Sequence, residues 1–272
     1  MLTMLTALAA VLAPSSPDCT PVSGAERLWQ DNIRWVIVGE HHGTNETPDA
    51  FANLVCLASQ SGRPVTVALE YNSDDQSVID RFLATADPVE ARQILLSLPR
   101  WHWSTKSSDG RTSTAFLRLF ETLRTMKRQG MITGIIASDV PSTWRGTPDR
   151  DAEMGKNWQA IAVPTNGLIV ALVGNVHAVR LAPFELGGRS IVPAASYLPR
   201  PQTMTLSVEG NAGMAWNCNA QGCGAHANGR NRQSTAGITY SIKPEDRWDA
   251  IYELGVATTA SEPVTIVQSD PD

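Results

Sequence analysis

The sequence predicts an α/β protein with a mostly parallel central sheet flanked by helices, a helical lid insertion and a β-rich disulfide loop near the C-terminus. Four hydrophobic, strand-like runs alternate with helix-like stretches, at 35–39, 64–70, 132–138 and 167–174, and this alternation is typical of a parallel sheet. Each run leads directly into polar residues, and ligands of open α/β sheets bind at the carboxyl ends of the strands. We therefore expect a functional site where these runs end.

The chain has 272 residues, of which 42% are hydrophobic and 18% charged, as in an ordinary globular protein with one large core. We expect a single α/β domain over 31–258, with the helical insertion at about 72–130. Residues 14–30 are expected to form a linker or tail, and 259–272 a C-terminal tail.

Residues 1–13 are apolar and end in Val11-Leu12-Ala13, which resembles the cleavage site of a signal peptide. No Lys or Arg precedes the apolar run, so an internal start whose charged amino end lies outside this chain is the alternative. Thirteen residues are too few to cross a bilayer as a helix, which takes about 20. We expect a secreted or periplasmic protein with no transmembrane segment.

A helix is predicted over 48–59, after the first strand, because apolar residues recur there at helical spacing. Three more helix-like segments, at 74–86, 88–97 and 113–129, lie between the second and third strands, where a single crossover needs only one. In the break between them, Trp101-His102-Trp103 is either a lid that stacks on a ligand or a plug that packs the insertion onto the body.

The last third of the chain changes to short β-like runs, at 190–194, 203–208 and 237–242, with a loop rich in Gly and Asn at 209–234. Its residues Trp248, Ile251, Tyr252 and Leu254 form an apolar set that is expected to dock on the core.

The four cysteines are an even set, which fits an exported protein with disulfides. We expect Cys218 to pair with Cys223 inside the loop, and Cys19 to pair with Cys56 on the first helix. A zinc site is the alternative, but the paired Cys-x-x-Cys spacing that it favours is absent.

The densest polar cluster follows the first strand, where Glu40, His41 and His42 lie between two glycines. A carboxylate beside an imidazole fixes the tautomer of the ring and raises its basicity, as a general base requires. The alternative is a hydrogen-bonded turn whose polar groups only satisfy the backbone.

Three further groups follow the other strands. Glu70 and Asp139 end the second and third strands, and His177 follows the fourth in Gly174-Asn175-Val176-His177. A solvated strand end, a helix N-cap and a satisfied core histidine are the respective alternatives. Their convergence at one sheet edge favours a functional site.

Several classes of function lack support. The net charge is −5 and no run of Lys or Arg occurs, which argues against nucleic acid as a partner. The chain contains no Gly-x-Ser-x-Gly elbow, no P-loop, no Gly-x-Gly-x-x-Gly fingerprint and no His-Glu-x-x-His.

The run Gly39-Glu40-His41-His42-Gly43, the strand ending in Glu70, and Gly174-Asn175-Val176-His177 together resemble the erythromycin esterase/ChaN-like superfamily, which is related to TraB/Tiki proteins. This resemblance implies an α/β fold with an inserted helical lid, and His42 as the cleft residue of the two adjacent histidines. Its members include lactone-opening esterases, metal-dependent peptidases and haem-binding proteins.

On this basis we expect an exported hydrolase that cleaves an ester or amide bond of a small-molecule substrate. His42 would remove a proton from water, Glu40 and Glu70 would orient it and balance its charge, and His177 would stabilise the oxyanion or protonate the leaving group. In a metal-dependent variant, His42, Glu70, Asp139 and His177 would hold Zn or Mn.

A haem- or iron-complex-binding protein without catalysis is the alternative. There His177 or Tyr71 would be the axial ligand and Trp101 and Trp103 would stack on the macrocycle. A third possibility is a member that keeps the fold and only binds a partner.

Overall fold

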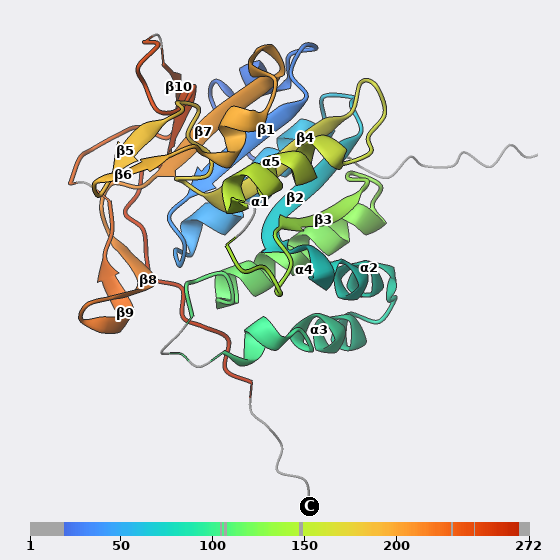
Figure 1. Ribbon diagram of the computed structural model, residues 1–272. Coiled ribbons are helices and arrows are strands. Elements are labelled where there is room, and N and C mark those ends of the chain that lie inside the picture. The colour runs from blue at the N-terminus through green and yellow to red at the C-terminus, as the bar shows by residue number, and fades with distance from the viewer. Residues whose placement is uncertain are drawn as a thin grey trace, which may run out of the picture.

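The computed structural model describes residues 19–103, 105, 108–146, 149–229, 231–241 and 243–266 (Figure 1). The predicted signal peptide, residues 1–13, lies outside them. The helices are α1 (Glu46–Ser59), α2 (Gln76–Ala84), α3 (Pro88–Leu96), α4 (Thr114–Arg128) and α5 (Arg150–Ala160). The strands are β1 (Trp35–Glu40), β2 (Val65–Asn72), β3 (Gly134–Asp139), β4 (Leu168–Gly174), β5 (Phe184–Leu186), β6 (Arg189–Ile191), β7 (Thr203–Glu209), β8 (Met214–Asn219), β9 (Gly222–Ala227), β10 (Gly237–Tyr240) and β11 (Ala250–Glu253).

Seven strands form the central sheet, in the order β10-β11-β7-β1-β4-β2-β3. All neighbouring pairs are parallel except β10 and β11. The predicted fold class is therefore confirmed. Strands β1, β2, β3 and β4 fall on the four hydrophobic runs, because a parallel strand covered on both faces is apolar along its length.

Successive side chains of β1 point to opposite faces of the sheet and pack into two separate cores. Val36 and Val38 belong to the larger core, which α1 and α4 cover, whereas Trp35 and Ile37 belong to the smaller core under α5. Figure 1 shows α5 in front of the sheet, with the helices of the 72–130 segment gathered below it. The sheet is thus the middle of three layers, and its strand ends remain open for a site.

The predicted helices between β2 and β3 are present as α2, α3 and α4. Helix α3 begins at a proline, and the side chain of its N-cap Asp87 accepts a hydrogen bond from the backbone N–H of Glu90, as expected at a helix start. Helix α4 begins at Thr114 without a proline, but the side chain of its N-cap Ser113 likewise accepts a hydrogen bond from a backbone N–H, that of Phe116. The two caps place the ends of these helices close to the positions that the sequence predicts.

The Gly/Asn-rich segment 209–234 was expected to be a loop, but most of it folds as the β8–β9 hairpin, paired from Met214↔Ala227 to Asn219↔Gly222. The hairpin is a separate two-stranded sheet beside the main one. Alternation along β8 turns Ala215 and Asn217 to one face.

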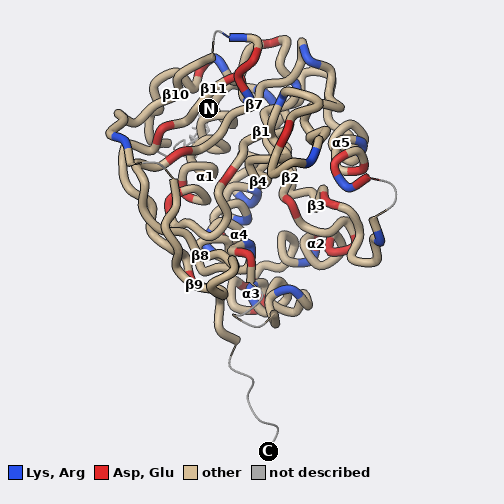
Figure 2. The backbone as a smooth tube through the Cα atoms, turned by 60° about the vertical axis from the view of Figure 1, so that its left-hand side comes forward, with Lys and Arg blue, Asp and Glu red and all other residues tan. Residues whose placement is uncertain are grey.

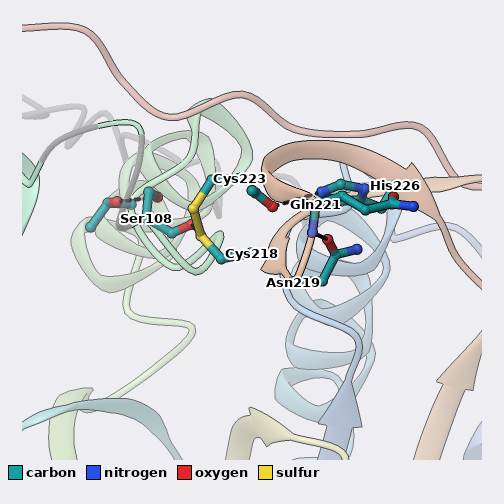
Figure 3. Close-up of a disulfide and its surroundings, with 8 residues drawn as sticks. Ser108, Cys218, Asn219, Gln221, Cys223 and His226 are labelled. Atoms are coloured by element: carbon teal, nitrogen blue, oxygen red, sulfur yellow. Dashed lines mark hydrogen bonds between the residues drawn. A yellow bond between two sulfur atoms is a disulfide. The ribbon is translucent and has the colours of Figure 1, made fainter.

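Both predicted disulfides are present, Cys19–Cys56 and Cys218–Cys223. The first ties the amino-terminal segment to α1. The second closes the end of the β8–β9 hairpin, where Cys218 Sγ lies 3.5 Å from the carbonyl oxygen of Ser108 (Figure 3). No cysteine of the chain is free, so no thiol can serve as a nucleophile.

Both segments expected to be tails carry ordered structure where they are described. Residues 25–29 form a 3-10 helix whose Leu28 is fully buried. Near the other end, the backbone N–H of Ser261 donates to the carbonyl of Gly43. No helix in the described part of the chain is long and apolar enough to cross a membrane. Figure 2 shows Lys and Arg scattered over the backbone among the acidic positions.

Candidate active site

The carboxyl ends of β1, β4, β2 and β3 lie side by side because these strands are neighbours in the sheet. A cleft of about 420 Å³ opens beside them. Its described lining comes from these strand ends, from the loop at Asp109 and from the β8–β9 hairpin, and consists of Glu40, His41, His42, Asp109, Gly174, Asn175, Val176, His177, Ala215, Asn217, Cys218 and Asn228. Open parallel sheets bind ligands at this place.

His42 is bound to the buried carboxylate at the end of β1. Its Nδ1 lies 2.8 Å from Glu40 Oε1, and its Nε2 lies 3.6 Å from Glu70 Oε2. Burial alone would lower the pKa of His42, but the charge and hydrogen bond of Glu40 and the charge of Glu70 raise it above the ordinary value. This shift favours the imidazolium form, which is a proton donor.

Glu70 is the central carboxylate of the site and accepts hydrogen bonds on both of its oxygens. Its Oε1 accepts hydrogen bonds from Arg111 Nη1 at 2.6 Å and Arg150 Nη2 at 2.5 Å, and its Oε2 accepts one from the backbone N–H of Gly174 at 2.7 Å. Burial would raise the pKa of Glu70, but Arg111, the two histidines and Arg150 hold it well below the usual range. Glu70 is therefore a fixed anion and cannot exchange protons near neutral pH.

Asp139, at the end of β3, forms a two-pronged pair with Arg150. Arg150 Nε lies 2.9 Å from Oδ1, and Nη2 lies 2.6 Å from Oδ2. Such a fork fixes the plane of the guanidinium. Asp139 thus holds Arg150, which in turn reaches Glu70 and His177.

His177 is held on both sides of its ring. Nδ1 lies 2.7 Å from Asp151 Oδ1, and Nε2 lies 3.0 Å from Arg150 Nη1 and 3.8 Å from Glu70 Oε1. A guanidinium can only donate hydrogen bonds, so Nε2 accepts and the ring proton is on Nδ1. His177 is accordingly the neutral imidazole of the site, with its lone pair on Nε2.

Gly174 lies at the centre of these groups. A Cβ atom at this position would lie 3.1 Å from His42 Nε2, 3.5 Å from Glu70 Oε2 and 3.5 Å from His177 Cδ2. A side chain here would press on His42 Nε2, whereas the two 3.5 Å distances are ordinary van der Waals contacts, so the position brings the strand backbone close to all three groups. The convergence expected from the strand ends is thus present for Glu40, His42, Glu70, Asp139 and His177.

The two adjacent histidines diverge. His41 Nε2 lies 3.2 Å from Asn175 Nδ2 and 3.8 Å from Glu209 Oε1, whereas His42 turns toward Glu70. Both rings line the cleft, so His41 borders it at a second point.

Sequence reasoning missed Arg111, Arg150 and Asp151. Arg150 and Asp151 are the first two residues of α5, and Arg111 follows a turn in the loop after α3. Neither residue type nor periodicity marks a loop residue that reaches across to the sheet edge. The Asp149 N-cap signal locates the helix start but not the direction of its side chains.

The residues expected to hold a divalent metal do not fit one. Among the described residues, no group of three His, Cys, Asp or Glu side chains is arranged to hold a metal ion. The carboxylates of Glu70 and Asp139 are instead occupied by Arg111 and Arg150. The oxygens that a metal ion would need at this position therefore already accept hydrogen bonds from guanidiniums.

The residues expected to bind haem are placed elsewhere. Tyr71 is fully buried between Phe116 and Phe120, and its hydroxyl donates to the carbonyl of Arg111. Burial raises the pKa of this hydroxyl. Tyr71 is therefore a core residue and no axial ligand.

The two tryptophans do not form a stacking pair either. Trp101 is 2% exposed and packs edge-on against Phe120, while Trp103 is 46% exposed. The first is a packing plug, and neither belongs to the described lining of the cleft. Of that lining, only Asp109 comes from the segment between β2 and β3.

Neither the models of protein families nor the curated proteins contain a match to this chain. Among solved structures, the type III effector HopBA1 is similar at 13% identity with a TM-score of 0.47, over 89% of this chain and 99% of that one. RRSP, a MARTX toxin effector domain from Vibrio vulnificus CMCP6, is similar at 22% identity with a TM-score of 0.42, over 70% of this chain and 36% of that one.

A further structure of bacterial protein toxins matches at 21% identity with a TM-score of 0.45, over 70% of this chain and 37% of that chain. This chain therefore spans little more than a third of the toxin chains RRSP and this structure. At these identities the similarity concerns the fold and says nothing about the roles of residues.

The expected membership of the erythromycin esterase/ChaN-like superfamily is wrong, because neither a family model nor a curated protein of that superfamily matches this chain. The TraB/Tiki relationship, the haem-binding role and the ester or amide hydrolysis that were inferred with it are withdrawn. The two motifs, at 39–43 and 174–177, are short. A glycine and a polar residue at the end of a buried strand are too common a pattern to define a family.

Proposed function

We propose that the cleft is the active site of an enzyme that works by general acid–base catalysis. The observation that carries this proposal is that two imidazoles lie beside one buried carboxylate, each with its other ring nitrogen bound to a separate acid. His42 Nε2 lies 3.6 Å and His177 Nε2 lies 3.8 Å from Glu70, while the Nδ1 atoms contact Glu40 and Asp151. A proton donor and a proton acceptor placed side by side are what a paired proton transfer requires.

His42 is the general acid. Glu40 accepts a hydrogen bond from Nδ1–H of His42. The distance of 3.6 Å from Nε2 to Glu70 is too long for a second hydrogen bond. The Nε2–H is thus free to point at a substrate atom that gains a proton. Glu40 keeps the ring oriented and, by raising its pKa, favours the protonated form.

His177 is the general base. Asp151 holds its Nδ1–H and accepts a second hydrogen bond from the backbone N–H of Ala194 at 2.8 Å, which fixes the carboxylate. Arg150 covers the Nε2 lone pair, and its side chain is 26% exposed. A substrate group that displaces Nη1 of Arg150 gains access to that lone pair.

A substrate therefore loses a proton to His177 and receives one from His42, and solvent restores both rings. Eliminations, isomerisations and group transfers have this proton balance. Glu70 stabilises the two imidazoles without itself titrating.

The test is untargeted mass spectrometry of a bacterial metabolite extract incubated with the purified protein. We expect at least one component to be consumed by the native chain and spared by both His42→Asn and His177→Asn. His102→Asn, at an exposed position outside the described lining of the cleft, serves as the matched control and should consume it normally. Consumption that persists in both cleft variants would remove the acid–base assignment.

We also propose that the protein works in an oxidising compartment, as a secreted or periplasmic protein. Both disulfides support this, because such bonds persist outside the reducing cytoplasm. Thiol titration under denaturing conditions should find no free thiol in protein made in the periplasm. Four free thiols in fully active protein would contradict a need for oxidation.

A further inference from the structure

Glu40 has one carboxylate oxygen that no described group satisfies. Oε1 lies 2.8 Å from His42 Nδ1, whereas Oε2 is buried and accepts no hydrogen bond. The residue is only 2% exposed, yet it lines the cleft. A buried carboxylate oxygen without a donor is costly, so a donor on a bound molecule would be strongly favoured there.

The cleft around this oxygen has a negative bias. No Lys or Arg belongs to its described lining, which includes the acids Glu40 and Asp109. Arg111 and Arg150 lie behind it, where carboxylates of the site already engage them. In the whole cluster, five carboxyl groups face two guanidiniums and one imidazolium, so the balance remains negative. The five acids are Glu40, Glu70, Asp109, Asp139 and Asp151.

The rest of the lining suits a compact group that donates several hydrogen bonds. Asn175, Asn217 and Asn228 offer amide oxygens, and Ala215 and Val176 supply small apolar surface. A divalent metal does not fit, because one free oxygen beside an imidazolium is a poor ligand set. An organic cation carries its charge over several N–H groups and matches dispersed acceptors.

We infer that the cleft binds its substrate through an ammonium or guanidinium group that donates to Glu40 Oε2. This inference rests on the proposed acid–base function, because the cationic group would fix the substrate between His42 and His177. Anionic substrates, including phosphates, would be repelled by the same lining.

The experiment is a titration of the full-length protein with methylguanidinium chloride at constant ionic strength, followed by the imidazole ¹H–¹⁵N signals of His42 and His177. N-methylacetamide is the uncharged control and sodium acetate the anionic one. We expect saturable shifts at His42 with methylguanidinium, and affinity about tenfold weaker or worse for both controls. An intermolecular cross-relaxation signal between the methyl protons and the His42 ring would locate the group.

Glu40→Gln should weaken methylguanidinium binding by about tenfold or more, while Glu185→Gln, on an exposed strand, should leave it unchanged. If Glu40→Gln does not fold, the cross-relaxation signal in the native protein decides. Equal binding of the amide, preferred binding of acetate, or binding unaffected in folded Glu40→Gln would each overturn the inference, and so would no saturable shift with methylguanidinium. The acid–base assignment would survive these results, because it depends on the histidine variants alone.

Discussion

Arg150 and His177 face each other with Nη1 of the guanidinium 3.0 Å from Nε2 of the imidazole. The contact is possible only while Nε2 carries no proton, because a guanidinium has no acceptor. We therefore expect the ¹⁵N spectrum at neutral pH to show His177 as the neutral Nδ1–H tautomer. A cationic His177 in the native protein would contradict this arrangement.

His42 should make the stability of the fold depend on pH. Burial opposes its charge, but Glu40 and Glu70 raise its pKa above the ordinary 6.5 of the unfolded chain. A group with a raised folded pKa contributes stability that is fully present below pH 6.5 and is lost as the pH rises through the folded value. Urea unfolding from pH 5.5 to 9 should show this decline, and Glu40→Gln should flatten it. An equally steep decline in that variant would rule out the Glu40 pairing as its cause.

Removing the charge of Glu70 should cost far more stability than removing that of a surface acid. Glu70→Gln leaves Arg111 and Arg150 without their shared carboxylate in a buried site, for which we expect a loss of about 3–5 kcal/mol in the free energy of unfolding. Glu121→Gln is the matched control, because its pair with Arg92 is exposed and should be worth under about 1 kcal/mol. Urea denaturation measures both losses of unfolding free energy. Similar values would show that the pairing of Glu70 with Arg111 and Arg150 does not stabilise the fold.

The pH dependence of Glu70 has the opposite sign to that of His42. Its folded pKa is depressed, so its contribution is present above the unfolded value near 4.5 and is lost as the pH falls through the folded value. Stability measured between pH 5 and pH 2 should therefore fall in the native chain more steeply than in Glu70→Gln. Parallel curves would contradict the depressed pKa.

Replacing Gly43 should destabilise the fold by more than the strain of its left-handed backbone alone. It has φ +82°, and a Cβ there would lie 2.0 Å from the carbonyl oxygen of Trp216 on β8. Gly62 has φ +76° with no atom within 4 Å of its Cβ position, so Gly62→Ala should cost only the left-handed backbone, about 1–2 kcal/mol. Gly43→Ala should lose more unfolding free energy and shift the backbone signals of the β8–β9 hairpin. Equal losses of unfolding free energy in the two variants would show that the β8–β9 hairpin can move away from Gly43 without cost.

The sheet and most of the candidate site could be predicted from the sequence, for a common reason. Buried parallel strands leave unbroken apolar runs, and the polar residues that follow them lie at one edge whatever the loops do. Glu40, Glu70 and His177 were located in this way.

The errors came from features that such runs do not encode. Tyr71 follows Glu70 directly, and side chains on a strand alternate between faces, so Tyr71 lies in the core with Leu69. The segment 209–234 has a composition typical of a loop, and pairing between distant positions made it a hairpin. Arg111 and Arg150 reach the edge from a loop and a helix start, which only the three-dimensional arrangement reveals.

The hairpin also determines when the cleft can exist during synthesis. Glu40 and His42 emerge early, but Ala215 and Asn217 of the same cleft follow some 175 residues later, at a position that the backbone N–H of Trp216 secures by donating to Gly43. A chain still leaving the ribosome therefore carries Glu40 and His42 without the wall that encloses them. The cleft is complete only once the last quarter of the polypeptide has folded back onto the first.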